Sequence, residues 1–202
     1  MVGRQEGIGM TGGIVVVMGV SGSGKTTIGE RLGAACGVHF GDADRLHPPA
    51  NVAKMAAGTP LTDEDRWPWL HAVLAWMNDH ADRTPRTELG VELGVAAVVG
   101  CSALKRKYRD LLRTASCPVR FAYLKGDRRT LATRLHRRQG HFFPEQLLAA
   151  QLADLEEPAP DENPVVVSIG ARPDAVVEQI VAGLRDAARP VDPRRARPTG
   201  SA

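Results

Sequence analysis

The stretch Gly19-Val20-Ser21-Gly22-Ser23-Gly24-Lys25-Thr26 follows a short apolar run, Ile14 to Met18, and precedes a segment with helical periodicity. It matches the pattern G-x-x-x-x-G-K-[ST] in the strand-to-helix setting that this pattern requires. Glycines in such a loop let backbone N–H groups converge on a phosphate, and the positive end of the following helix adds to the attraction. The stretch therefore predicts a binding site for the phosphates of a nucleotide.

Within this loop we expect Lys25 to reach the β and γ phosphates and the Thr26 hydroxyl to help hold Mg²⁺, so ATP and Mg²⁺ are the expected cofactors. The residues expected to bind the nucleotide are Gly19, Val20, Ser21, Gly22, Ser23, Gly24, Lys25, Thr26 and Thr27. A chance glycine-rich turn is the alternative, and the strand before it and the helix after it argue against that. Nucleotide binding alone does not identify an enzyme, because switch proteins and regulatory ATPases share this loop.

The composition is that of an ordinary globular domain. The chain has 202 residues, 43% of them hydrophobic and 24% charged, which argues against a disordered or fibrous protein. Aromatic residues make up only 4%, which disfavours stacking platforms for single-stranded nucleic acid. The net charge of +3 comes from residues 185–202, where five arginines face two aspartates, so the body is neutral and we predict no nucleic-acid partner.

The cysteines and the apolar runs bear on the compartment. Cys36, Cys101 and Cys117 are an odd number without paired spacing, which fits neither a zinc site nor a disulfide framework. The longest apolar run, Ile14 to Val20, is far shorter than the ~20 residues that a membrane span needs. We therefore predict a cytoplasmic protein with no membrane contact.

Valine-rich runs alternate with longer helical patterns, which is typical of a parallel sheet covered by helices. Strands are expected at Ile14 to Met18, Val38 to Gly41, Val95 to Val99, Val119 to Leu124 and Pro164 to Ser168. Helices are expected at Lys25 to Cys36, Arg66 to Asp82, Lys105 to Thr114, Asp127 to Arg138, Pro144 to Glu156 and Pro173 to Ala188. The prediction is a three-layer α/β fold with a five-stranded parallel sheet, whose ligands gather at the carboxyl ends of the strands.

The expected domain covers residues 13–188. Residues 1–12 form a flexible extension in this prediction, and residues 189–202, rich in arginine and proline, form a disordered tail. The segment Ala81 to Gly94 is expected to be a variable surface connection.

The second predicted strand ends in Asp42-Ala43-Asp44, with two carboxylates on one side of an extended segment. One carboxylate near Mg²⁺ and one able to accept a hydroxyl proton is the arrangement that a small-molecule phosphotransferase needs. A turn or helix cap is the alternative for this tripeptide. The preceding phosphate loop makes us favour the catalytic interpretation.

Further blocks follow in one order along the chain. They are Gly41-Asp42-Ala43-Asp44 with Leu46-His47-Pro48 and Asn51, Lys54-Met55 with Gly58-Thr59-Pro60-Leu61, Asp63-Glu64-Asp65-Arg66-Trp67-Pro68-Trp69-Leu70, Cys101-Ser102-Ala103-Leu104-Lys105 with Tyr108-Arg109, Tyr123-Leu124-Lys125-Gly126, Arg134-Leu135 with Arg138, Gly140-His141-Phe142-Phe143, and Gln151-Leu152 through Glu157-Pro158. Over roughly residues 14–186 these blocks resemble the gluconokinase family of small P-loop kinases, relatives of shikimate and adenylate kinases.

The resemblance implies a P-loop kinase fold, usually dimeric, that transfers the γ phosphate of ATP to the 6-hydroxyl of D-gluconate and feeds the pentose phosphate pathway. It implies a lid at about residues 134–150. Asp44 would orient or deprotonate the acceptor alcohol, and Asp42 would support Mg²⁺ through water. The residues implied in holding gluconate are Asp44, His47, Lys105, Arg109 and His141. The catalytic residues implied are Lys25, Asp44 and the lid arginines Arg134 and Arg138.

Each of these roles has a structural alternative. Lys105 and Arg109 lie one helical turn apart, and such a pair is commonly a solvated helix face. His47 before Pro48 suits a turn, and Trp69 beside Pro68 suits packing. Two other functions also stay open. They are a different small-metabolite kinase, such as a shikimate or sugar-acid kinase, and a nonenzymatic ATP-binding switch protein.

Overall fold

Five parallel strands form the centre of the molecule. The computed structural model describes residues 12–137 and 145–188. The strands are β1 (Gly13–Met18), β2 (His39–Asp42), β3 (Val95–Gly100), β4 (Val119–Lys125) and β5 (Val165–Ser168). They pair in the order β2-β3-β1-β4-β5, and every pairing is parallel. The predicted five-stranded parallel sheet is confirmed.

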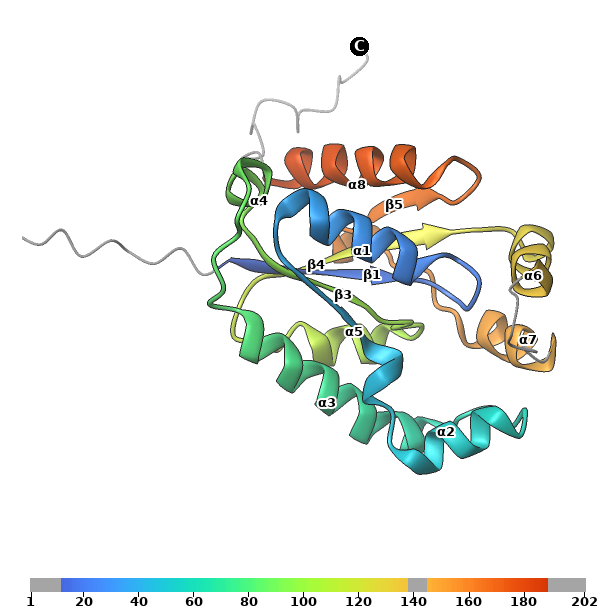
Figure 1. Ribbon diagram of the computed structural model, residues 1–202. Helices are drawn as coiled ribbons and strands as arrows, with labels where there is room; N and C mark the ends of the chain where they lie inside the picture. The colour runs from blue at the N-terminus through green and yellow to red at the C-terminus, as the bar shows by residue number, and fades with distance from the viewer. Residues whose placement is uncertain (1–11, 138–144, 189–202) are drawn as a thin grey trace, which may run out of the picture.

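Helices cover both faces of this sheet (Figure 1). The α-helices are α1 (Lys25–Cys36), α2 (Pro49–Ala56), α3 (Asp63–His80), α4 (Glu88–Leu93), α5 (Arg106–Leu112), α6 (Arg128–Arg137), α7 (Glu145–Asp154) and α8 (Pro173–Ala188), with 3-10 turns η1 (Ala43–Leu46) and η2 (Pro160–Glu162). Helices α1 and α8 lie on one face, and α3 and α5 lie on the other. Helices α6 and α7 lie at the end of the sheet where the strands stop.

Strand β1 shows why the core has two halves. All six of its residues are buried, as expected for a central strand of a parallel sheet. Because side chains alternate along a strand, Val15 and Val17 join the core under α1 and α8, whereas Ile14, Val16 and Met18 join the core over α3 and α5. The carboxyl end of β1 is thereby fixed from both faces, and the phosphate loop begins there.

The expected helix starts and connections need three corrections. Helix α3 begins at Asp63 rather than Arg66, because the Thr62 side chain accepts from the Asp65 N–H and the Asp65 carboxylate accepts from the Thr62 N–H in a capping box. Helices α2 and α4 were not predicted, since both are too short to show a helical period. Helix α4 lies within the expected surface connection, 81–94, and its Leu93 is buried.

The expected extension at residues 1–12 and the expected tail at 189–202 lie outside the described residues, apart from Gly12. In the described ranges, no helix is both long and apolar enough to cross a membrane.

Candidate active site

The phosphate loop joins β1 to α1 with glycines in conformations that other residues rarely adopt. Gly19, Gly22 and Gly24 have φ angles of 143°, 82° and 96°. No side chain caps the first turn of α1, so its N–H groups stay available to an anion. Within residues 12–137 and 145–188, the Ser23 hydroxyl is the one buried side-chain polar atom without a hydrogen-bond partner. A loop with unsatisfied donors at a helix start suits a phosphate ligand.

Two polar side chains at the end of the loop, Lys25 and Thr26, make hydrogen bonds within the protein. Lys25 Nζ donates to the Val20 carbonyl at 3.3 Å, which holds the ammonium group over the loop. The Thr26 hydroxyl donates to Asp42 Oδ2 at 3.0 Å, although the two residues belong to different elements. The end of β2 therefore lies against the phosphate loop.

Asp42 and Asp44 do not alternate on an extended strand. Ala43 begins the η1 turn, and Asp42 Oδ1 accepts the Asp44 N–H at 3.1 Å as the cap of that turn. The cap interpretation is thus correct for Asp42, while its other carboxylate oxygen still accepts from Thr26. Asp44 is exposed, so its carboxylate is accessible to a ligand in front of the loop.

His47 lies in an aromatic setting after this turn. Its ring stacks on Trp69 with ring centroids 4.3 Å apart, and its Nδ1 lies 3.3 Å from the Asn51 amide nitrogen. Burial lowers the pKa of the imidazole, although the charge of Asp44 opposes this, so the neutral form is favoured near pH 7. Trp69 is buried and donates to the Ala43 carbonyl at 2.7 Å, which confirms that it packs.

Lys105 lies in a cluster of charges that links three helices. Its Nζ is 2.9 Å from Asp63 Oδ1 on α3 and 3.2 Å from Asp154 Oδ1 on α7. Arg66, also on α3, places NH2 2.8 Å from Asp154 Oδ2 and NH1 3.0 Å from the Tyr108 hydroxyl. Hydrogen bonds from Lys107, Tyr108 and Lys105 hold the pKa of Asp63 well below its usual range. The lysine is therefore half-buried among carboxylates rather than on a solvated face.

Sequence reasoning missed Arg66 as a functional candidate. It is only 8% exposed, and an arginine this buried beside a second cation is a strong attractor for a carboxylate. The block Asp63-Glu64-Asp65-Arg66 at a helix start was visible in the sequence, but the partners on α5 and α7 were not.

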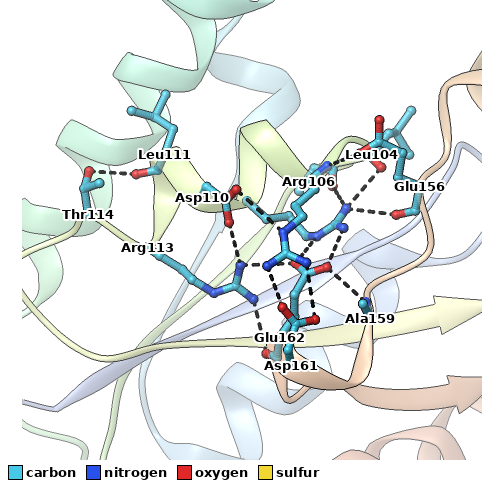
Figure 2. Close-up of polar contacts among 12 residues, drawn as sticks. Leu104, Arg106, Asp110, Leu111, Arg113, Thr114, Glu156, Ala159, Asp161 and Glu162 are labelled. Atoms are coloured by element: carbon cyan, nitrogen blue, oxygen red, sulfur yellow. Dashed lines mark hydrogen bonds and ion pairs between the residues drawn. The ribbon is translucent and has the colours of Figure 1, made fainter.

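The prediction that Arg109 holds substrate is wrong, and so is the solvated-face alternative for it. The side chain is fully buried, and Glu162 accepts from Nε at 2.6 Å and from NH2 at 2.8 Å. NH1 donates to the carbonyls of Ala103, Leu104 and Glu156. Figure 2 shows the polar groups that gather around Glu162. The guanidinium is engaged within the protein, so Arg109 is a structural residue.

A cavity of about 210 Å³ lies beside the phosphate loop. Its walls include Thr27 and Ile28 from α1, and Ala171 and Val176 from the loop after β5 and the start of α8. Arg134 of α6 also lines it and donates from NH2 to the Ile169 carbonyl at 2.6 Å. The other expected lid residues, Arg138 and His141, lie outside the described residues.

A parallel sheet in this order, with a phosphate loop after β1 and an aspartate from β2 against it, defines a P-loop kinase. A family model described as "AAA domain" matches residues 14–158. The gluconokinase of Gluconobacter oxydans (strain 621H) is 44% identical over 181 residues, which cover 90% of this chain and 96% of that protein. The thermoresistant gluconokinase of Escherichia coli (strain K12) is 45% identical over 154 residues, 76% of this chain and 82% of that protein.

A solved structure supports the same assignment. The crystal structure of a gluconokinase from Sinorhizobium meliloti 1021 is 42% identical, with a TM-score of 0.75 over 88% of this chain and 94% of that one. The chain belongs to the gluconokinase family.

Proposed function

We propose that the protein transfers the γ phosphate of ATP to the 6-hydroxyl of D-gluconate, giving 6-phospho-D-gluconate, an intermediate of the pentose phosphate pathway, and ADP. The observation that carries this proposal is the contact of Thr26 with Asp42, at 3.0 Å. It joins the phosphate loop to the segment that bears Asp44 and His47. An acceptor bound against that segment would therefore lie next to the terminal phosphate.

ATP fits the loop and the cavity beside it. The phosphates would lie on the N–H groups of residues 19–27, with Lys25 neutralising the terminal phosphate. The cavity, lined by Thr27, Ala171 and Val176, has the size and the largely apolar walls that suit a purine base. Arg134 reaches this region from α6 and would stabilise the charge that develops on the phosphates during transfer. We propose the same role for Arg138.

The oxygen atoms of Thr26 and Asp42 fit Mg²⁺. They are hard ligands, and the described ranges contain no cluster of three or more His, Cys, Asp or Glu side chains that would favour another kind of metal site. Mg²⁺ commonly keeps several waters and binds through one or two protein oxygens together with substrate phosphates. When bound, the ion would neutralise phosphate charge. Thr26 would hold it directly and Asp42 through water.

We propose that the acceptor site combines the cations of Arg66 and Lys105 with the carboxylate of Asp44. Gluconate is an anion, and Arg66 and Lys105 offer two positive groups for its carboxylate. Neutral His47 can hydrogen-bond to a hydroxyl, and we propose that His141 also contacts the sugar acid. Asp44 would accept the proton of the 6-hydroxyl as that oxygen bonds to the γ phosphorus and the bond to the ADP oxygen breaks.

We further propose a cytoplasmic homodimer. All three cysteines are free and buried, which suits a reducing compartment. Light scattering on the purified protein tests the dimer.

The deciding experiment measures ADP formation from Mg-ATP with D-gluconate, other aldonates, shikimate, nucleoside monophosphates or no acceptor. Stimulation by gluconate, with phosphorus NMR placing the new phosphate on the 6-oxygen, is the expected result. Stimulation by shikimate or another acid instead would overturn the substrate assignment. Slow hydrolysis that no acceptor accelerates would favour a switch protein.

A further inference from the structure

The C-terminal half of α7 contacts both ligand sites at once. Gln151 Oε1 accepts the backbone N–H of Ser21 in the phosphate loop at 2.7 Å. One helical turn later, Asp154 accepts from Arg66 at 2.8 Å and pairs with Lys105 at 3.2 Å. Residues with this spacing lie on the same face of a helix. A single rigid surface of α7 thus joins the loop expected to hold ATP to the cations expected to hold the acceptor.

The Gln151 contact engages a group that belongs to the nucleotide site. Backbone N–H groups of a phosphate loop are the donors that a polyphosphate uses. In this structure, a side chain 130 residues away in sequence accepts one of them. A nucleotide whose phosphate accepts a hydrogen bond from this N–H, or whose binding shifts the loop around Ser21, must displace the Gln151 amide.

Asp154 likewise occupies groups that are expected to bind a ligand, here the cations of the acceptor site. Its carboxylate binds Arg66 and Lys105 as an acceptor carboxylate would, and Asp63 supplies a second negative group to the same lysine. Arg66, Lys105 and Lys107 thus share the two carboxylates of Asp63 and Asp154. A further anion must therefore compete with Asp154, the last residue of α7, whose carboxylate holds both Arg66 and Lys105.

Packing lets α7 carry the effect from one contact to the other. Leu148 is 2% exposed and lies in the same core cluster as Leu131 and Leu135 of α6. Leu155, directly after Asp154, packs against both core clusters. Because Gln151 and Asp154 share one turn of α7, a shift of this helix after the loss of one polar contact would also move the other residue.

We propose that Gln151 and Asp154 are positioning residues that couple the two sites. An acceptor anion that displaces Asp154 from Arg66 and Lys105 also weakens the hold of Gln151 on Ser21, and a nucleotide acts in the reverse direction. Each ligand consequently binds more tightly when the other is present. The identity of the acceptor as gluconate rests on the proposed function, whereas the two α7 contacts do not.

The test is isothermal titration calorimetry on the full chain with Mg²⁺. D-gluconate is titrated with and without saturating AMP-PNP, and AMP-PNP is titrated with and without gluconate. The variants are Gln151→Ala and Asp154→Asn. Gln146→Ala, an exposed glutamine on the same helix, and Asp79→Asn, an exposed aspartate on α3, are the matched controls. Thermal unfolding of each variant confirms that it is folded.

In the native chain and both controls, AMP-PNP should lower the gluconate Kd by about fivefold or more, and gluconate should lower the AMP-PNP Kd by the same factor. In Gln151→Ala and Asp154→Asn this factor should fall to about one. AMP-PNP alone should bind Asp154→Asn about threefold more tightly than the native chain, although Asp154 does not contact the phosphate loop.

Either of two results overturns the coupling. The first is that AMP-PNP leaves the gluconate Kd of the native chain unchanged. The second is that AMP-PNP lowers the gluconate Kd of Gln151→Ala and Asp154→Asn as much as that of the native chain. If gluconate binds none of the proteins, the proposed function fails, and the AMP-PNP titrations then decide the inference by themselves. An unchanged AMP-PNP Kd in Asp154→Asn would in that case reject it.

Discussion

Arg109 and Glu162 form a bidentate ion pair in the interior, with donor–acceptor distances of 2.6 and 2.8 Å and side chains that are each 1% exposed. The pair fixes α5 to the η2 turn. Glu162 also accepts from Arg113 at 3.1 Å and from the Ala159 N–H at 3.0 Å, and Arg106 binds Asp161 in the same turn (Figure 2). This network holds the segment between α7 and β5, and hence the position of α7 beside the active site.

The first prediction concerns the stability of this pair. Arg109→Met leaves a buried carboxylate without its main partner, so the free energy of unfolding should fall by about 3–5 kcal/mol. Urea denaturation at pH 7 measures the loss. Adding Glu162→Leu to Arg109→Met should recover part of it, because the unpaired charge is then removed. If Arg109→Met alone were as stable as the native chain, the pair would not stabilise the fold.

The second prediction is a pH dependence. Hydrogen bonding to Arg109 lowers the pKa of Glu162 from 4.5 to about 2. Because the folded-state pKa is below the unfolded one, the stabilisation is complete above pH 4.5 and is lost as the pH falls from 4.5 toward 2. Unfolding free energies measured across this range should therefore decline less steeply for Glu162→Gln than for the native chain. The control Asp79→Asn should keep the native slope, and equal slopes for all three proteins would contradict the assignment.

The third prediction concerns the acceptor proton. Asp44→Asn keeps the shape of the side chain and removes its capacity to accept a proton, so kcat with gluconate should fall by about 10²–10⁴-fold. The KM for ATP should stay within about twofold, since Asp44 is not part of the phosphate loop. Steady-state assays separate the two constants, and Asp79→Asn is the control. Near-native turnover of Asp44→Asn would remove this residue from the mechanism.

The fourth prediction concerns the cation that sequence reasoning missed. Arg66 uses separate nitrogens for Tyr108 and Asp154, an arrangement that a lysine cannot reproduce. Arg66→Lys should therefore raise the KM for gluconate about tenfold, which corresponds to a loss of about 1.4 kcal/mol, and should not raise the KM for ATP. Arg83→Lys, an exposed arginine after α3, is the matched control. An equal rise of both KM values would instead indicate a general disturbance of the site.

Local patterns made the fold and the phosphate loop predictable. The phosphate loop and β1 are contiguous in sequence, so their glycine spacing and apolar run carried the information. The surroundings of the Lys105 and Arg109 side chains could not be predicted, because they depend on Asp154 and Glu162, which are distant in sequence. A spacing of four residues predicts a shared helix face, but it does not say whether that face meets solvent or another segment. Helices α2 and α4 were missed because one or two turns give no reliable period.

The last prediction tests the cavity beside the phosphate loop as the site of the adenine base. Ala171 is exposed at its wall, so an indole there would fill part of the approximately 210 Å³ without disturbing the core. Ala171→Trp should raise the KM for ATP about tenfold or more and leave the KM for gluconate within about twofold, because Ala171 is remote from Arg66 and Lys105. Ala34→Trp, on the exposed side of α1, is the control for adding an indole. Inorganic tripolyphosphate, which lacks the base, should inhibit the native chain and Ala171→Trp equally. If the KM for ATP of Ala171→Trp were also unchanged, the base would have to lie elsewhere and the cavity would play no part in nucleotide recognition.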